Sequence, residues 1–282
     1  MTQFLVYDVF TDRAFGGNQL AVIPDATHLR DDKLQSIARE FNFSESTFVY
    51  PPADPAHTAK VRIFTPTMEI PFAGHPTIGT AIALHDLGHK GAMTLELGIG
   101  PIPCTVSDTG ASFQTSAPLE RLADPDTALV AAALGLQPRD IKTDTHAPTQ
   151  ASLGLPFVIA ELRNEAALNA CTPSVDHIRQ GATEYPAGLD FALYPYVRQG
   201  NTIDARMFAP LDNITEDPAT GSAAATLAAL LTELAGAPQT LTIRQGFAMG
   251  RPSIIQATTT HAPIKVTISG QAVKTMEGTL VI

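Results

Sequence analysis

The amino-acid sequence predicts an α+β protein of two similar domains, each a curved, barrel-like β-sheet wrapped around one central apolar helix. Three observations lead to this prediction. Two helical segments are apolar on nearly every side, the chain contains an internal duplication, and the predicted strands outnumber the predicted helices. A helix that is apolar all round must be buried, and a strongly curved sheet is the layer best able to enclose it.

The two apolar helices are predicted at 78–87 and 223–235. The second has one charged residue between Ala223 and Ala235, and Gly88 and Gly236 follow the two helices as stop signals. Each helix is preceded by a short polar turn, at 71–77 and 216–222. The first N–H groups of a helix lack intrahelical partners and favour an anion, so each turn is a candidate seat for a substrate carboxylate.

The duplication is visible in landmarks that recur at a nearly constant spacing. The phrase Arg-Ile-Phe-Thr-Pro at 62–66 corresponds to Arg-Met-Phe-Ala-Pro at 206–210, and an alternating strand that ends in glycine follows each helix. The separations are 144 residues for Arg62 and Arg206, 147 for Gly74 and Gly221, 148 for Gly88 and Gly236, and 146 for Gly100 and Gly246. This period is too long for a solenoid and indicates two similar domains, with both helix N-termini facing a cleft between them.

Length and composition agree with this organisation. The chain has 282 residues, of which 44% are hydrophobic and 16% charged, enough for two cores. We expect an N-terminal domain over 1–116 and a C-terminal domain over 117–274. The last strand, 275–282, is a candidate for pairing with the first domain and completing it.

Charge and cysteine content restrict the partners. The net charge is −10, the isoelectric point is near 5.2, and Lys and Arg form no runs, which argues against nucleic acid and anionic membranes. The first residues lack the pattern of a signal peptide, and no segment approaches the roughly 18 apolar residues that span a bilayer. The two cysteines, Cys104 and Cys171, lie in different halves and predict reduced thiols in a cytoplasmic protein.

The remaining elements follow from local patterns. Alternating hydrophobic residues between turn formers predict strands, and apolar residues at helical spacing after acidic or proline starts predict helices. In the first half, strands are expected at 4–10, 19–23, 48–50, 60–64, 93–106 and 111–116, and a helix at 31–41. In the second half, helices are expected at 125–136 and 174–180, and strands at 156–162, 189–197, 202–208, 241–246 and 275–282.

Candidate catalytic groups lie in and near the two turns. His75, Asp217, Glu216 and Ser222 belong to the turns themselves. Glu45 is present in only one half, because the same offset places Leu189 opposite it. Each also has a purely structural interpretation. His75 could be a hydrogen-bonded structural histidine, Asp217 and Ser222 could cap the helix, and Glu45 could be a solvated or capping glutamate.

Other chemistries have little support in the sequence. There is no zinc-type His or Cys spacing, no dinucleotide fingerprint, no P-loop and no nucleophile elbow. Arg62 and Arg206 precede the two turns, and we interpret them first as structural or field-setting residues and second as substrate contacts.

Several motifs together resemble the phenazine biosynthesis PhzF-like isomerase family, which is related in fold to diaminopimelate epimerase and proline racemase. The resemblance extends from residue 4 to residue 253. Its motifs are Gly-Gly-Asn-Gln-Leu-Ala-Val at 16–22, Phe-Ser-Glu-Ser-Thr-Phe at 43–48, Arg-Ile-Phe-Thr-Pro at 62–66, Phe-Ala-Gly-His-Pro-Thr at 72–77, Glu-Asp-Pro-Ala-Thr-Gly-Ser-Ala at 216–223, and Gln-Gly-x-x-Met-Gly-Arg-Pro-Ser at 245–253.

The resemblance implies a role for each matching residue. Glu45 would be the general acid/base, and His75, Asp217 and Ser222 would be the other polar active-site residues. The backbone amides of two pairs, Gly74 with His75 and Gly221 with Ser222, would bind the substrate carboxylate. Related epimerases use one cysteine at each helix N-terminus, whereas Ala73 and Thr220 occupy those places here. A two-thiol racemase is therefore disfavoured, and Cys104 and Cys171 are expected in the core.

The hypothesis from sequence is a cofactor-independent and metal-independent isomerase of the trans-2,3-dihydro-3-hydroxyanthranilate isomerase type. It would shift a proton on a small carboxylate-bearing substrate in the interdomain cleft, and the resemblance implies a homodimer. Two alternatives stay open: an amino-acid or hydroxy-acid racemase or epimerase on the same fold, and a catalytically silent member that binds a small anion or a protein partner.

Overall fold

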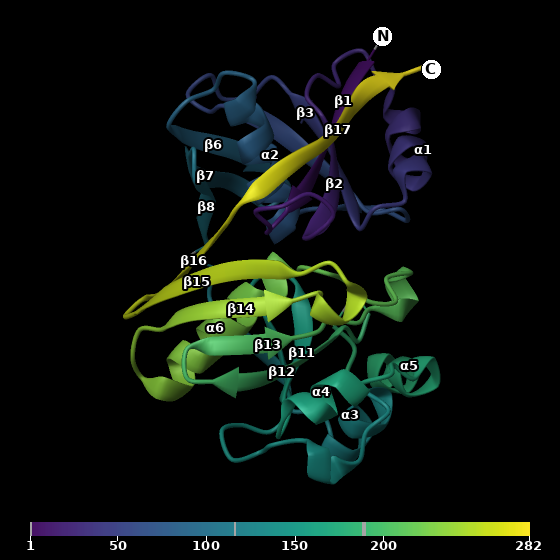
Figure 1. Cartoon of the computed structure of the whole chain (residues 1–282), viewed down its shortest axis with the longest axis vertical. Coiled ribbons are helices and arrows are strands. Elements are labelled where there is room, and N and C mark those ends of the chain that lie inside the picture. The colour runs from purple at the N-terminus through teal and green to yellow at the C-terminus, as the bar shows by residue number, and fades with distance from the viewer. Residues whose placement is uncertain (1, 116, 188–189) are drawn as a thin grey trace. The chain divides into compact units, whose positions relative to one another are not determined.

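The computed structural model describes residues 2–115, 117–187 and 190–282 (Figure 1). The chain forms two compact units. Unit 1 comprises Met1–Thr115, Arg251–Ile254 and Thr267–Ile282, and unit 2 comprises Ser116–Gly250 and Ile255–Val266. Residues 251–254 and 267–274 thus group with unit 1, whereas the sequence boundaries placed them in the second domain. Leu189, the predicted counterpart of Glu45, lies outside the described residues.

Unit 1 is a mixed sheet with two helices. Its strands are β1 (Thr2–Val9), β2 (Asn18–Ile23), β3 (Glu45–Tyr50), β4 (Ala59–Phe64), β5 (Glu69–Ile70), β6 (Ala92–Leu97), β7 (Gly100–Ser107), β8 (Gly110–Thr115) and β17 (Ala272–Leu280), and its helices are α1 (Asp31–Phe41) and α2 (Gly74–Asp86). β17 pairs antiparallel with β1 from Ala272 to Leu280. The pairs β2–β3 and β4–β6 are parallel, and β1–β2, β3–β4, β6–β7 and β7–β8 are antiparallel.

Helix α2 is the centre of unit 1. It is buried from Gly74 to Leu84 and contacts β1, β2, β7 and β8, and Figure 1 shows it among these strands with α1 outside them. A Cβ atom added at Gly79 would lie 2.5 Å from Leu20 Cδ2, so the helix packs directly on β2. The amphipathic α1 instead presents Leu34, Ile37 and Ala38 to its own small core.

Unit 2 repeats this arrangement. It contains β9 (Glu120–Ala123), β10 (Thr149–Ser152), β11 (Pro156–Glu161), β12 (Leu193–Gln199), β13 (Thr202–Ala205) and β14 (Thr240–Gln245), with helices α3 (Thr127–Ala133), α4 (Glu165–Ala170), α5 (Val175–Glu184) and α6 (Gly221–Ala235) and the short 3₁₀ turns η1 (Pro138–Asp140), η2 (Pro210–Asp212) and η3 (Phe247–Met249). β15 (Ser253–His261) and β16 (Ile264–Gly270) divide between the units.

The pairing order in unit 2 matches that of unit 1. β11–β12 and β13–β14 are parallel, and β12–β13 is antiparallel. α6 connects the last parallel pair, as α2 connects β4 to β6, and is buried from Gly221 to Thr232. The α+β prediction and the two buried helices at 78–87 and 223–235 are therefore confirmed.

Some predicted elements differ in extent. The helix expected at 125–136 is α3, which is shorter because the chain turns at Gly135 with a φ of +71°. α4 was missed because its six residues are too few to display a helical period. No helix in the described ranges has the length and apolar character needed to cross a membrane.

Asp190 is a buried acid in unit 2. It is 6% exposed, and its Oδ2 accepts a hydrogen bond from the Leu211 N–H at 2.9 Å. Burial raises the pKa of this carboxyl to about 6 and also raises the pKa of Asp212. The folded state thus favours the protonated form of Asp190, which contributes stability below about pH 4 that is lost as the pH rises through about 6.

We expect Asp190→Asn to remove this pH dependence. An amide oxygen still accepts from Leu211 N–H but cannot ionise, so the variant should be more stable than wild type above pH 7, by on the order of 2 kcal/mol. Urea unfolding between pH 4 and 8 measures the difference, with the exposed Asp144→Asn as control. A constant difference across this pH range would contradict the assignment.

Candidate active site

The first group of candidate residues lies where β2, β3 and α2 begin. We call Asn18, Glu45, Gly74 and His75 the unit 1 group. Asn18 and Glu45 are the first residues of β2 and β3, which are parallel and place Leu20 opposite Glu45. Gly74 and His75 are the first two residues of α2. Parallel pairing therefore brings the starts of both strands to the edge where the helix begins.

Glu45 and His75 are in direct contact. Glu45 Oε2 lies 3.2 Å from His75 Nδ1, and the side chains are 13% and 3% exposed. Burial lowers the pKa of His75 to about 3. The ring is therefore neutral near pH 7, and the contact is a close approach of a carboxyl to an uncharged imidazole rather than a salt bridge.

The His75 Nδ1 atom lies near two polar side chains. Besides Glu45, the Asn18 side-chain nitrogen lies 3.3 Å away. The His75 side chain also has a hydrogen bond with the Gln19 backbone. An amide nitrogen only donates, so Nδ1 accepts from Asn18 when the ring proton is on Nε2. When Nδ1 holds the proton, the ring is a donor on this side.

Asn18 is a further candidate site residue, which the sequence analysis did not single out. It is 2% exposed and lies in the motif at 16–22, yet only the motif as a whole was used for the resemblance. The sequence feature that could have indicated Asn18 is its position: a polar amide directly after Gly16 and Gly17 and before an apolar strand.

The second group lies at the start of α6. We call Asp217, Thr220, Gly221, Ser222 and Gln245 the unit 2 group. The Thr220 hydroxyl donates to Asp217 Oδ2 at 2.5 Å, and the Asp217 N–H donates to Met207 O at 3.0 Å. Gly221 and Ser222 are the first residues of α6, and Ser222 is 7% exposed. That Asp217 and Ser222 share a cleft with Glu45 stays a prediction.

Gln245 holds the turn before α6 and was also missed. Its Nε2 donates to Asp217 O at 2.8 Å and to Thr220 Oγ1 at 2.9 Å, and its Oε1 accepts from Thr220 N–H at 3.3 Å. Tyr194 O–H donates to the same oxygen at 3.2 Å. Gln245 is 1% exposed, so these bonds fix the backbone that presents Asp217.

The starts of α2 and α6 differ from those of ordinary capped helices. Ala73, before α2, has no polar side chain, and Thr220, before α6, uses its hydroxyl on Asp217. The N–H groups at Gly74 and His75, and at Gly221 and Ser222, are the ones that an α-helix leaves without carbonyl partners. The first turn of each helix is therefore suited to a carboxylate.

The arginines before the turns are ion-paired. Arg206 forms two bonds to Glu216, at 2.8 and 2.7 Å, and donates to the carbonyls of Leu168 and Cys171. Arg62 binds Glu69 in the same two-pronged manner, at 2.8 and 2.7 Å. These contacts fit the interpretation of Arg62 and Arg206 as structural residues. Glu216, a candidate catalytic group in the sequence, is the ion-pair partner of Arg206.

Neither cysteine belongs to these groups. Cys104 and Cys171 are free and buried, and burial raises the pKa of both thiols to about 12. Within the described ranges, no three His, Cys, Asp or Glu side chains lie together in a way that could hold a metal ion.

We expect the His75 ring to stay neutral down to about pH 4, because charging it in its buried position is unfavourable. Free histidine is half-protonated near pH 6.5. The folded state should thus lose stability relative to the unfolded chain as pH falls from about 6.5 toward 3. Histidine NMR, with His75→Gln to assign the signal, measures the titration. A midpoint near 6.5 would show that the ring is solvated.

We expect Gln245→Met to cost about 2–4 kcal/mol of unfolding free energy, because it leaves buried groups of the Asp217 turn without partners. Tyr194→Phe removes one bond to the same side chain and should cost only about 1 kcal/mol. Urea unfolding of both variants provides the comparison. Equal losses would mean that Gln245 is held by packing rather than by its hydrogen bonds.

Comparison with known proteins gives a consistent result. Residues 7–278 match the family model described as phenazine biosynthesis-like protein. An uncharacterized isomerase from Mesorhizobium japonicum is 40% identical, over 99% of this chain and 98% of that protein. The trans-2,3-dihydro-3-hydroxyanthranilate isomerase from Pseudomonas aeruginosa is 35% identical, over 99% of both chains.

A solved structure shows the same fold. The Bacillus anthracis phenazine biosynthesis protein of the PhzF family superposes with a TM-score of 0.86 at 22% identity, covering 100% of this chain and 99% of the other. The predicted fold class is thereby confirmed, and the family model and the relatives above confirm the family resemblance. The chain belongs to the phenazine biosynthesis-like PhzF family, and it is an isomerase.

Proposed function

We propose that this isomerase shifts a proton on trans-2,3-dihydro-3-hydroxyanthranilate or a similar small ring carboxylate, without a cofactor. The observation that supports this most directly is the contact between Glu45 and the neutral ring of His75 at the start of α2. The substrate class follows from the relative of that name, which aligns over 99% of both chains.

The proposed step needs only one acid/base group. The Glu45 carboxylate removes a proton from a ring carbon, and the electron pair left behind forms a new double bond as the neighbouring one shifts. Glu45 then returns the proton to the carbon at the far end of the three-carbon unit. Nothing is oxidised or reduced, and Glu45 ends in its starting state.

His75 would stay uncharged throughout this step. Its neutral imidazole lies 3.2 Å from Glu45, so no second charge lies beside the carboxyl as Glu45 gains and loses its proton. Charge in this buried position would be unfavourable. A positioned acid/base of this kind contributes on the order of 10²–10⁴ in rate.

The other site residues would bind the substrate. The amides of Gly74 and His75, and those of Gly221 and Ser222, would hold the carboxylate. Asp217 would accept from a polar substituent of the ring, with its carboxylate fixed by the Thr220 hydroxyl. Ser222 would donate its hydroxyl to the same end of the substrate.

The assembly and location belong to the same proposal. We keep the homodimer that the resemblance implied, and sedimentation equilibrium measures it. Two free, buried cysteines support a cytoplasmic enzyme.

We expect Glu45→Gln to lower kcat by about 10²–10⁴ with little change in stability, because glutamine has the shape of glutamate but cannot accept a proton. The measurement is deuterium uptake from D₂O, followed by NMR. The substrates are dihydro-hydroxyanthranilate, proline, diaminopimelate and related carboxylates. Glu40→Gln, an exposed glutamate on α1, is the matched control.

Each outcome has a distinct meaning. Uptake on one compound that depends on Glu45 supports the proposal and identifies the substrate class. Wild-type rates in Glu45→Gln would remove Glu45 from its role. Inversion of a stereocentre would favour a racemase or epimerase, and tight binding of a carboxylate without any exchange would favour a silent binding protein.

A further inference from the structure

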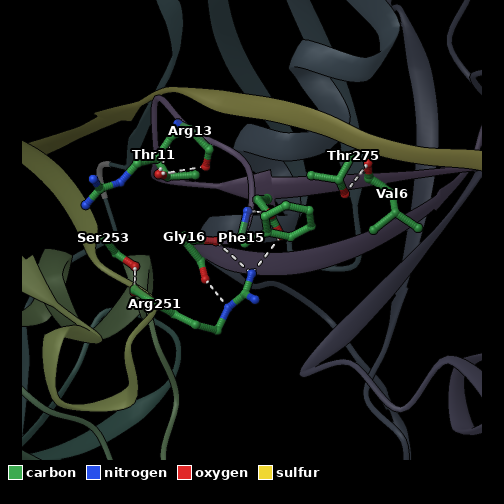
Figure 2. Close-up of polar contacts among 10 residues, drawn as sticks. Val6, Thr11, Arg13, Phe15, Gly16, Arg251, Ser253 and Thr275 are labelled. Carbon is green, nitrogen blue, oxygen red and sulfur yellow. Dashed lines mark hydrogen bonds and ion pairs between the residues drawn. The ribbon is translucent and has the colours of Figure 1, made fainter.

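Arg251 makes three hydrogen bonds in unit 1, two of them to the backbone directly before Asn18 of the unit 1 group. Its Nε donates to Gly17 O at 2.8 Å, and its Nη2 donates to Gly16 O at 2.7 Å and to Asp8 Oδ1 at 2.7 Å. Figure 2 shows the guanidinium reaching the loop of residues 11–17 in this way. The Asp8 side chain is 4% exposed and that of Arg251 is 21% exposed, so the pair is largely shielded from water.

The same loop is fixed from two further directions. Asp8 Oδ2 accepts from the Phe15 N–H at 2.7 Å, and the Gly17 N–H donates to Pro252 O at 3.1 Å. Gly17 has a φ of +59°, and a Cβ atom added there would lie 2.3 Å from Val9 O. The peptide units of Gly16 and Gly17 are therefore held in one conformation by Asp8, Arg251 and Pro252.

The residue that follows this loop is Asn18. The Gly17 carbonyl that Arg251 binds belongs to the same peptide unit as the Asn18 N–H. Asn18 pairs with Val9 in the sheet, and its side-chain nitrogen lies 3.3 Å from His75 Nδ1. A displacement of the Gly16 and Gly17 backbone would move the Asn18 Cα atom, and the Asn18 side chain would move with it, away from this nitrogen.

We propose that Arg251 is a positioning residue: it fixes the Gly16 and Gly17 carbonyls so that Asn18 donates to His75 Nδ1, and thereby sets the His75 tautomer opposite Glu45. This inference rests on the proposed function for its consequence in catalysis. Arg251 itself acts through Asn18 and does not touch the reacting atoms.

Arg251 also has a structural role, which the test must separate. The ion pair with Asp8 joins residues that are 243 apart in the sequence, so its loss lowers stability whatever happens at His75. Arg251→Lys separates the two roles. A single ammonium group can stay opposite Asp8, but it lacks the planar fork that reaches both carbonyls and Asp8 together.

The primary measurement is ¹⁵N NMR of the histidine rings at pH 7 in labelled protein, where the two nitrogen shifts report the tautomer. We expect Asn18→Ala to move the His75 signal toward the Nδ1–H form. Arg251→Lys and Arg251→Met should move it in the same direction. Arg62→Met, a unit 1 arginine whose side chain is 24% exposed and ion-paired with Glu69, is the matched control and should leave the signal in place.

Kinetics provide the second measurement. We expect Arg251→Lys to lower kcat about ten- to a hundredfold with KM nearly unchanged, as for a misplaced catalytic group. In an Asn18→Ala background the same substitution should have little further effect, because a residue that acts through Asn18 has no target left. Equal losses in both backgrounds would overturn the proposal.

The outcomes distinguish this proposal from the one on which it rests. A folded Arg251→Lys variant with a wild-type His75 signal and wild-type kcat refutes the positioning role and leaves Glu45 unaffected. Wild-type exchange in Glu45→Gln refutes the catalytic assignment, whereas the His75 signal still decides whether Arg251 orients Asn18. If Arg251→Met does not fold, the lysine variant decides alone.

Discussion

The burial of α2 and α6 along nearly their whole length is the constraint on which the rest of the structure depends. A helix without a polar face has no stable position at a surface, so strands must pack around it, and its first turn must lie inside the protein. Buried N–H groups at that turn need polar partners. Polar residues therefore gather where each helix begins, with Glu45 and His75 in unit 1 and Asp217, Thr220 and Gln245 in unit 2.

The two helices meet this requirement differently. At the start of α6 the polar groups bind one another, since Thr220 donates to Asp217 and Gln245 binds the backbone of both. At the start of α2 a neutral histidine stands between a carboxylate and an amide. The duplicated scaffold thus has one helix N-terminus where the polar side chains hydrogen-bond to one another and to the turn, and another where an ionisable carboxyl lies beside a neutral imidazole.

Much of this could be predicted from the sequence, because the decisive signals were local or repeated. The two apolar helices, their glycine stops and the constant spacing predicted the fold class and the polar turns before both helices. The motif resemblance named Glu45 and His75 as candidate site residues, and the structure shows them in contact. What escaped prediction depends on tertiary contacts. Asn18 and Gln245 are ordinary polar residues until folding buries them. Residues 267–270 belong to β16 and 272–274 to β17, and the pairing of β16 with β8 and of β17 with β1 shows that the chain has already returned to unit 1.

That return of the chain has a consequence for recombination among relatives. Unit 1 is discontinuous: it needs Arg251–Ile254 and Thr267–Ile282 in addition to everything up to Thr115. An exchange of gene segments with a single crossover near residue 116 would combine one parent's Asp8 and Gly16–Gly17 loop with the other parent's residue 251 and last strand. Such chimaeras retain this unit only when both parents have compatible residues at these contacts. Inheritance of unit 1 is therefore linked to the codons for residues 251–254 and 267–282.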